Sequence, residues 1–433
     1  MERTLIKDTI NKVGEIVAVK GRVLIRRDHG KIIFLDVSDY SGLIQVITNE
    51  NVGIGDCVEI EGLIKARPEK LVNSKLFTGE IELEAKKIIV LAKSEVYPFD
   101  MGKPNLDAEL PTLLDNRGLT LRHPKVRAIF KVEEVVIDSF RRALQTKNFL
   151  EFQSPSIIPA VPEGGSEVFK VKYFEHEAYL SQSPQLYKSL LVSAFERVFS
   201  VNKVFRAELS VTTTHITEFV SLDAELGFID SWLEVKDMAE YVIKFIMTEV
   251  KNKCAAELEM YETTIPESSE KIPTLKMREA QQIIFERTGR DCRKEKDLAP
   301  EDEREICKWS KEKHGSELVF ISHYMTKYRP FYTYPDDENP EFNQGFDLLG
   351  RGREWLTGGR RINEYKMLME HVNEWKINPE KIELYLQAFR YGMPPLGGFA
   401  FGAERITMFI LGLSNIREAS MFPRDMERID LKL

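Results

Sequence analysis

The feature that most restricts the fold of this chain is a pair of expected strands that carry charged residues among apolar ones. They cover residues 204–208 and 218–225, and a polar loop joins them. Because side chains alternate between the faces of a strand, Arg206 and Glu208 share one face, and Asp223 shares a face with two other polar residues. Charges in such surroundings need partners, which indicates either a ligand site on a sheet or a ladder of structural salt bridges.

Three further segments have the composition of ligand-binding loops or strand ends. Glu163 precedes a glycine pair, a pattern that suits either a lid over a cationic group or an ordinary exposed turn. Polar residues are dense at 181–188, where Lys188 lies one turn into an expected helix and offers a point charge to a carboxylate, unless this is simply a solvated helix start. The glycine-rich residues 397–402 allow a ligand close to the backbone, and Arg405 follows where an anion is favoured.

The first 93 residues contain five short strand patterns separated by turn signals. The expected strands are 17–24, 31–37, 43–48, 57–65 and 80–90. Five short strands in about 90 residues predict a small closed barrel of the OB type, although strand count alone also fits another small β-barrel or sandwich.

The rest of the chain is predicted to form a hinge and a larger domain. Four prolines punctuate residues 94–124, which we interpret as the hinge, and a helical period follows Pro124. Residues 125–433 mix strands with helices such as 232–254 and 274–288. Because regular βαβ alternation is absent, the predicted class is α+β with an antiparallel sheet.

Composition excludes several classes of protein. Hydrophobic residues make up 43% and charged residues 30%, and no apolar run approaches the ~18–20 residues of a membrane-spanning helix. The N-terminal residues lack the apolar stretch of a signal peptide, which predicts a cytoplasmic protein. The four cysteines form no CxxC pair, which argues against zinc. A net charge of −8 still permits RNA binding through local basic groups.

In order along the chain, three segments resemble the three motifs of class II aminoacyl-tRNA synthetases, specifically those of the aspartyl-tRNA synthetase family. The stretch that ends at Pro155 resembles motif 1, residues 205–225 resemble motif 2, and residues 398–405 resemble motif 3. The short spacing between motifs 2 and 3 is like that of archaeal and eukaryotic members. The resemblance implies ATP-dependent activation of L-aspartate, transfer to tRNA-Asp, and a homodimer with Pro155 at its interface.

The resemblance implies an ATP site without a phosphate-binding glycine loop. Arg206 would bind the α-phosphate and the substrate carboxylate, Arg405 would hold the γ-phosphate, and Phe219 would stack on adenine opposite Arg405. The implied catalytic residues are Arg206, Glu208 and Arg405. The implied ATP-binding residues are Arg206, Glu208, Thr214, His215, Ile216, Phe219, Glu354, Gly402, Ala403, Glu404 and Arg405.

A metal site and an amino-acid site are implied beside it. Glu354 and Thr357 would carry Mg²⁺, with Asp347 nearby, because this ion prefers hard oxygen ligands. Lys188 and Arg361 would clasp the side-chain carboxylate of aspartate, and Lys188 most favours aspartate over asparagine. The implied aspartate-binding residues are Glu163, Ser183, Gln185, Lys188, Arg206, Asp223, Thr357 and Arg361.

The N-terminal barrel would bind the tRNA anticodon. Phe34 would stack on an unpaired base and Gln45 would read a base edge, although a core position is the alternative for Phe34. The implied anticodon contacts are Arg27, His29, Phe34, Gln45, Arg67 and Glu80. His29 accompanies relaxed tRNA choice in some bacterial members, which favours an enzyme that also charges tRNA-Asn.

One departure and three alternatives remain open at this point. Thr214 stands where the family usually has arginine, so an ATP or acceptor-end contact is in question. The alternatives are an asparaginyl-tRNA synthetase, a non-catalytic RNA-binding or regulatory paralogue, and a tRNA-independent ligase such as an asparagine synthetase. Retention of four converging charges argues against the second, and the barrel argues against the third. These charges are Arg206, Glu354, Arg361 and Arg405.

Overall fold

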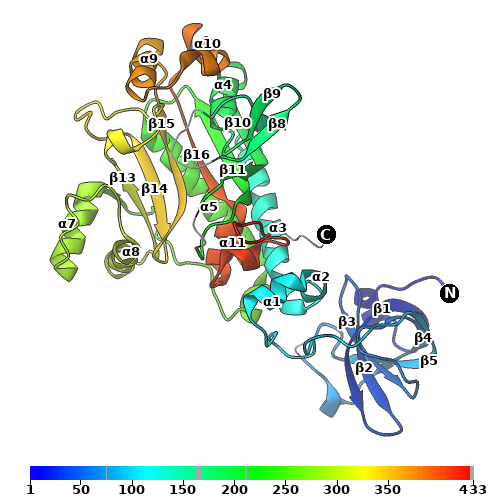
Figure 1. Ribbon diagram of the computed structural model, residues 1–433. Coiled ribbons are helices and arrows are strands. Elements are labelled where there is room, and N and C mark those ends of the chain that lie inside the picture. Colours follow the sequence, from blue (N-terminus) through cyan, green and yellow to red (C-terminus); the bar gives the residue numbers. More distant parts are fainter. Residues whose placement is uncertain (75, 162–167, 210–211, 430–433) are drawn as a thin grey trace. The chain divides into compact units, whose positions relative to one another are not determined.

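The computed structural model describes residues 1–74, 76–161, 168–209 and 212–429. It forms two compact units, Met1–Asn116 and Arg117–Leu433, each of which is visible in Figure 1. The division falls inside the stretch that we interpret as a hinge. In the described ranges, no helix is long and apolar enough to cross a membrane.

The first unit is built around a closed five-stranded barrel with strand order β1-β2-β3-β5-β4. Its strands are β1 (Ile16–Asp28), β2 (Ile33–Ser38), β3 (Leu43–Thr48), β4 (Cys57–Ala66) and β5 (Ile81–Ala92). Buried and partly exposed residues alternate along β3 and β4, which sends one set of side chains into the barrel and leaves the other outside. The predicted OB-type barrel is confirmed.

The second unit contains an eight-stranded sheet with order β12-β13-β14-β15-β16-β11-β10-β6. The strands are β6 (Leu150–Glu151), β10 (Arg197–Phe205), β11 (Glu218–Gly227), β12 (Thr274–Lys276), β13 (Leu318–Ser322), β14 (Gly345–Gly350), β15 (Arg353–Arg361) and β16 (Leu396–Gly402). The six central strands pair in antiparallel fashion, as predicted, whereas the edge strands β12 and β6 pair in parallel with β13 and β10.

Helices pack on one face of this sheet and form the main core with it. The covering helices are α3 (Pro124–Gln145), α5 (Trp232–Lys253) and α11 (Ala403–Leu411). Strand alternation sends Leu222 and Ala224 into that core and therefore turns Asp223 to the opposite face. The predicted helix at 274–288 is wrong for its first three residues, because these pair with β13 as strand β12.

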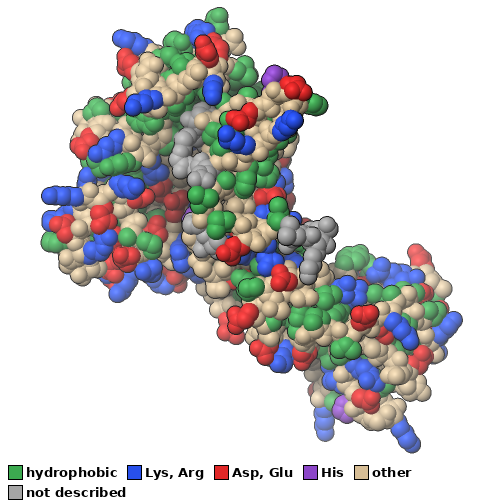
Figure 2. All heavy atoms as spheres, viewed as in Figure 1, with side chains coloured by type: hydrophobic (Ala, Val, Ile, Leu, Met, Phe, Trp, Pro, Cys, Tyr) green, Lys and Arg blue, Asp and Glu red, His purple; other side chains and the backbone are tan. Residues whose placement is uncertain are grey.

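The remaining elements belong partly to the first unit and partly to the second. A small sheet has the order β7-β9-β8. The other elements are β7 (Ile157–Ile158), β8 (Lys170–Tyr173), β9 (His176–Leu180), α1 (Leu110–Asp115), α2 (Arg117–Thr120), α4 (Gln185–Phe195), α6 (Ala255–Met260), α7 (Met277–Thr288), α8 (Pro300–His314), α9 (Tyr365–Glu374) and α10 (Glu383–Arg390), with 3₁₀ turns η1 (Ile6–Asn11), η2 (Glu69–Leu71), η3 (Thr326–Tyr328), η4 (Pro379–Ile382) and η5 (Ile416–Ala419). On the face that Figure 2 shows, basic and acidic side chains are interspersed over each unit, so the negative net charge is not concentrated there.

Candidate active site

Four buried charged side chains meet between α4 and the open face of the sheet. Lys188 Nζ lies 3.0 Å from Asp223 Oδ1 and 3.4 Å from Glu225 Oε2, and Arg361 Nε lies 3.0 Å from Glu225 Oε1. These side chains are between 0% and 8% exposed. Two cations therefore face two carboxylates in a space with little access to water, where an unpaired charge costs several kcal/mol.

The local sequence explains how these groups reach one another. Pro184 precedes α4, and Ser183 Oγ accepts a hydrogen bond from Gln185 N at 3.1 Å, so the helix starts there and directs Lys188 toward the sheet. On β16, Gly398 leaves the room that Glu225 occupies, because a Cβ at that position would collide with Glu225 Oε2 and the carbonyl oxygen of Ala224. A glycine-rich strand is thus a requirement of this site.

Glu225 is a site residue that the sequence-based assignment missed. Burial by itself raises the pKa of Glu225, but Arg361 and Lys188 outweigh burial and lower it. Gln185 completes the group, since its Nε2 donates to Ser189 Oγ at 2.9 Å and lies 3.5 Å from Glu225 Oε1. The two-residue spacing from Asp223 indicated the face of Glu225, but nothing local indicated its partner on β15.

A cavity of about 640 Å³ lies beside this charged group, over strands β11, β15 and β16. Its lining includes predicted ATP-site residues, namely Arg206, Glu208, Thr214, His215, Ile216, Phe219, Glu354, Gly402, Glu404 and Arg405. Thr357, which was predicted to bind aspartate and the metal ion, also lines it. The sequence-based assignment missed Ser221, Trp355, Leu356, Ala400, Phe401 and Ile416, which line it as well. Ala403, which was predicted to bind ATP, is fully buried at the start of α11 and is not part of this lining.

The charges in this cavity suit a polyphosphate. Arg206 holds its guanidinium carbon 5.4 Å from the centre of the Phe219 ring, and Arg405 Nη1 lies 3.7 Å from Glu354 Oε1. Phe219, the ring expected to stack on adenine, therefore already has a cation, Arg206, near one of its faces. Burial lowers the pKa of His215, and Arg405 and Arg206 lower it further against the opposing effect of Glu208, so the imidazole is neutral at pH 7.

Oxygen donors for a divalent cation lie beside Arg405. Burial, and then Asp347, raise the pKa of Glu354 to about 7 against the opposing effect of Arg405. Asp347 is 4% exposed and pairs with Arg329 through Oδ2, and its Oδ1 has no hydrogen-bond partner in the described part of the chain. The strand register places Asp347 opposite Thr357. Among the described residues, no group of three or more His, Cys, Asp or Glu side chains is placed to hold a metal ion. The Asp347 and Glu354 carboxylates nevertheless offer the hard oxygen atoms that a divalent cation accepts, and Asp347 Oδ1 is not engaged by another described group.

Glu404 lines the same cavity, but its carboxylate is hydrogen-bonded to the protein backbone. Both carboxylate oxygens lie 3.0 Å from Val220 N and accept its hydrogen, which holds the start of β11 beside Phe219. Burial raises the pKa of Glu404 to about 7, and burial and then Glu404 raise the pKa of Glu133 on α3 to about 8. Both carboxyls are thus more easily protonated in the folded protein.

The raised pKa values of Glu133 and Glu404 predict that the free energy of unfolding depends on pH. A carboxyl with a raised pKa contributes stability that is present below about pH 4.5 and is lost as pH rises through its folded value near 8. We expect Glu133→Gln to raise the free energy of unfolding at pH 8.5 by about 1–2 kcal/mol and to have little effect at pH 4.5. Urea denaturation at both pH values measures this, and an equal change at the two values would contradict it.

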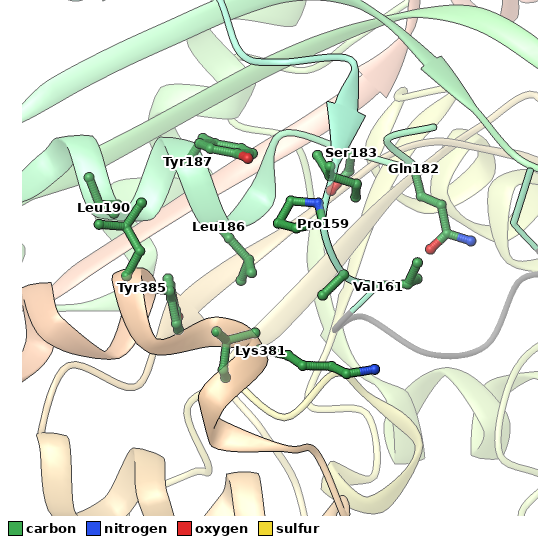
Figure 3. A pocket seen from close by; sticks show the side chains of 13 residues that line it. Pro159, Val161, Gln182, Ser183, Leu186, Tyr187, Leu190, Lys381 and Tyr385 are labelled. Carbon is green, nitrogen blue, oxygen red and sulfur yellow. The ribbon is translucent and has the colours of Figure 1, made fainter. Parts of the chain in front are cut away.

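The remaining predicted aspartate-site residues differ in position. Ser183 lies at an apolar pocket of about 700 Å³ that includes Leu186, Leu190 and Tyr385, as Figure 3 shows. Lys188 does not line this pocket, whose lining is mostly apolar and includes Lys381. Glu163 lies outside the described residues. Pro155, predicted at a dimer interface, is exposed between β6 and β7.

In the first unit, predicted anticodon residues form a hydrogen-bonded row on the outside of the barrel. Arg27 pairs with Asp36 at 2.6 Å and donates to Gln45 Oε1 at 3.3 Å, and Gln45 Nε2 donates to Glu82 Oε2 at 3.1 Å. The nearby Arg67 Nε lies 3.8 Å from Glu82 Oε2. The row includes Asp36 and Glu82, which the sequence-based assignment missed.

Two aromatic rings and one exposed acid complete this region. The His29 ring packs edge-on against the half-buried Phe34, with 5.5 Å between their centroids. Glu80 is exposed and precedes β5, which begins at Ile81, whereas Glu82 lies within the strand and points along the row. The structure thus places Glu82 in this row, and Glu80 stays a predicted anticodon contact.

Comparison with known proteins agrees with this arrangement. Residues 109–426 match the family model of class II tRNA synthetases (D, K and N), and residues 17–91 match that of the OB-fold nucleic acid binding domain. The chain therefore belongs to the class II tRNA synthetases.

Relatives that match nearly the whole chain are aspartate–tRNA ligases, a smaller group within this family. The Aspartate--tRNA(Asp/Asn) ligase of Deinococcus radiodurans is 38% identical over 437 residues, with 99% of each chain covered. The Aspartate--tRNA(Asp) ligase of Pyrococcus abyssi is 36% identical over 429 residues, with 96% of each covered. Among solved structures, the asparaginyl-tRNA synthetase of Pyrococcus horikoshii complexed with asparaginyl-adenylate has a TM-score of 0.89 at 28% identity, with 99% of each chain covered.

Proposed function

We propose that this protein activates L-aspartate with ATP and transfers it to tRNA-Asp. The observation that carries the proposal is the buried group of Lys188, Arg361, Asp223 and Glu225. Aspartate would bring an ammonium group, which Asp223 can accept, and a side-chain carboxylate, which Lys188 and Arg361 can accept. Asparagine brings one negative charge fewer and would leave the two cations poorly compensated, which selects against it.

The chemistry requires positioning and charge neutralisation. The α-carboxylate oxygen of aspartate attacks the α-phosphorus of ATP, and the bond from that phosphorus to the pyrophosphate oxygen breaks. Arg206 neutralises charge at the α-phosphate, and Arg405 holds the γ-phosphate. The carboxylate is itself the nucleophile, so a general base is unnecessary. A hydroxyl of the 3′-terminal ribose of tRNA then attacks the aspartyl carbonyl carbon, and AMP leaves.

Glu354, Asp347 and Thr357 would hold Mg²⁺ in this proposal. When bound, the ion neutralises phosphate charge. Glu354 lies 3.7 Å from Arg405, so both groups can contact the same phosphate region. We also propose that two copies of the chain associate around the exposed Pro155, and that the reaction takes place in the cytoplasm.

The proposed tRNA partners are tRNA-Asp and tRNA-Asn. The contact between His29 and Phe34 supports the wider choice, because it places the histidine beside the ring proposed to stack on an anticodon base. The D. radiodurans relative bears the name of an Asp/Asn enzyme. Charging assays with both tRNA transcripts test this: aspartylation of both is expected. Charging of tRNA-Asp alone would overturn only the wider choice, and failure with both would overturn the function.

Phe34→Ala is expected to weaken charging without affecting amino-acid activation. Loss of a base–aromatic stack costs about 1–3 kcal/mol, so kcat/KM for tRNA should fall by about 5- to 150-fold. Aspartate-dependent ATP–pyrophosphate exchange should remain within about twofold. Tyr40→Ala is the matched control, because Tyr40 is an exposed aromatic of the same barrel in the β2–β3 turn. Equal losses in both variants, or a loss of exchange, would contradict the role of Phe34.

A further inference from the structure

Residues 415–428, which follow α11, hold residues 212–217, the part of the loop that leads into β11. Arg417 Nη1 donates to the carbonyl oxygen of Thr212 at 2.8 Å, and Ile416 N donates to that of Thr213 at 2.8 Å. Further along the loop, Thr217 N donates to the carbonyl oxygen of Arg424 at 2.8 Å. The C-terminal segment therefore binds the loop on both sides of Thr214 and His215.

Arg417 is the centre of these contacts. It is 6% exposed, its Nε pairs with Asp425, and its Nη1 also donates to Asn415 Oδ1 at 3.2 Å. The planar guanidinium can serve a carboxylate, an amide and a backbone carbonyl at once, and a lysine ammonium has no such fork. Its neighbour Ile416 lines the ATP-site cavity, so the segment also reaches that cavity directly.

Arg117 also fixes this C-terminal segment, through three hydrogen bonds to its backbone. Its Nε donates to the carbonyl oxygen of Met421 at 2.9 Å, and its Nη2 donates to those of Glu418 at 2.9 Å and Ser420 at 2.7 Å. The guanidinium carbon lies 5.3 Å from the centre of the Phe130 ring of α3. Burial lowers the pKa of Arg117 to about 10, so it remains charged at neutral pH. The segment is thus anchored to α2 and α3 and in turn supports the loop.

We propose that Arg417 is a positioning residue for ATP. It fixes the loop that carries Thr214 and His215 at the nucleotide cavity, and Arg117 holds the segment from which it acts. The inference rests on the proposed function, since it assigns a role within that reaction. A displacement of about 1 Å in groups that position a substrate can reduce the rate by about 100-fold, so this support matters even though Arg417 does not itself line the cavity.

The test compares Arg417→Lys with wild type by calorimetric titration of MgATP and by aspartate-dependent pyrophosphate exchange. We expect Kd and KM for ATP to rise about tenfold, because the lysine can retain Asp425 but not also Thr212. KM for aspartate should stay within about twofold, because Lys188, Asp223 and Arg361 lie on α4, β11 and β15. Arg390→Lys is the matched control, since Arg390 forms an exposed ion pair with Glu383.

Asp425→Asn gives a second test that keeps the arginine. It removes the ion pair but leaves the bond from Arg417 to Thr212, so a smaller rise in Kd for ATP, about threefold, is expected. A lower kcat or lower thermal stability with unchanged Kd and KM for ATP in both variants would overturn the proposal and leave Arg417 a structural residue. If wild type binds MgATP but shows no aspartate-dependent exchange, the proposed function fails, and the Kd values still decide the role of Arg417.

Discussion

Lys188→Met is expected to lower kcat/KM for aspartate in pyrophosphate exchange by at least about 1,000-fold, the largest effect of any substitution considered. The substitution removes a cation 3.0 Å from Asp223 and 3.4 Å from Glu225, inside a site that is almost closed to water. A site built to pair a polar group discriminates by about 10⁴–10⁵ when one partner is missing, because the groups left behind are buried and unpaired.

Because Lys188 is buried, the Lys188→Met variant is also expected to be less stable, so a second variant is needed to separate loss of activity from loss of stability. Removing one partner of a buried pair costs about 3–5 kcal/mol of stability. Lys188→Met combined with Asp223→Asn removes one charge of each sign and should recover much of that stability without recovering activity. Lys170→Met, at a position whose side chain is 66% exposed, is the control. Exchange within tenfold of wild type in the stable double variant would contradict the assignment of Lys188 to substrate binding.

Arg206→Ala is expected to lower kcat for exchange by about 100- to 1,000-fold, the loss that follows removal of one donor to a charge that develops in the transition state. Arg206 is only half-buried and lies over the Phe219 ring, so its removal leaves little unpaired charge in the protein. The melting temperature should therefore change by no more than about 2 °C. An unchanged kcat with a raised KM would show that Arg206 contributes ground-state binding alone.

Much of the site was predictable because it depends on local periodicity. The expected strand at 204–208 is wrong after Phe205, where β10 ends, so Arg206 lies just beyond the strand. Alternation along residues 218–225 nevertheless placed Asp223 on one particular face of its strand, and the proline before α4 indicated where Lys188 would enter. The closed barrel followed from five short strands with turn signals between them. In each case the pattern is contained within about ten residues, and the structure preserves it.

Other parts depend on contacts between distant segments, which no local pattern encodes. Glu225 bonds to Arg361 across 136 positions in sequence, and Arg417 bonds to Thr212 across 205. Glu82 was missed because its place in the row depends on its contact with Gln45, 37 positions away. Strand β12 was read as helix because its three residues gain their partners only from β13.

The central claim is that the buried charges of Lys188 and Arg361 select an acidic amino acid. The most direct test is ATP–pyrophosphate exchange of the wild-type protein with L-aspartate and with L-asparagine in parallel. We predict a kcat/KM for aspartate at least about 100-fold above that for asparagine, because the amide leaves one buried cation poorly compensated. Exchange driven by asparagine alone, or equally by both amino acids, would contradict the account.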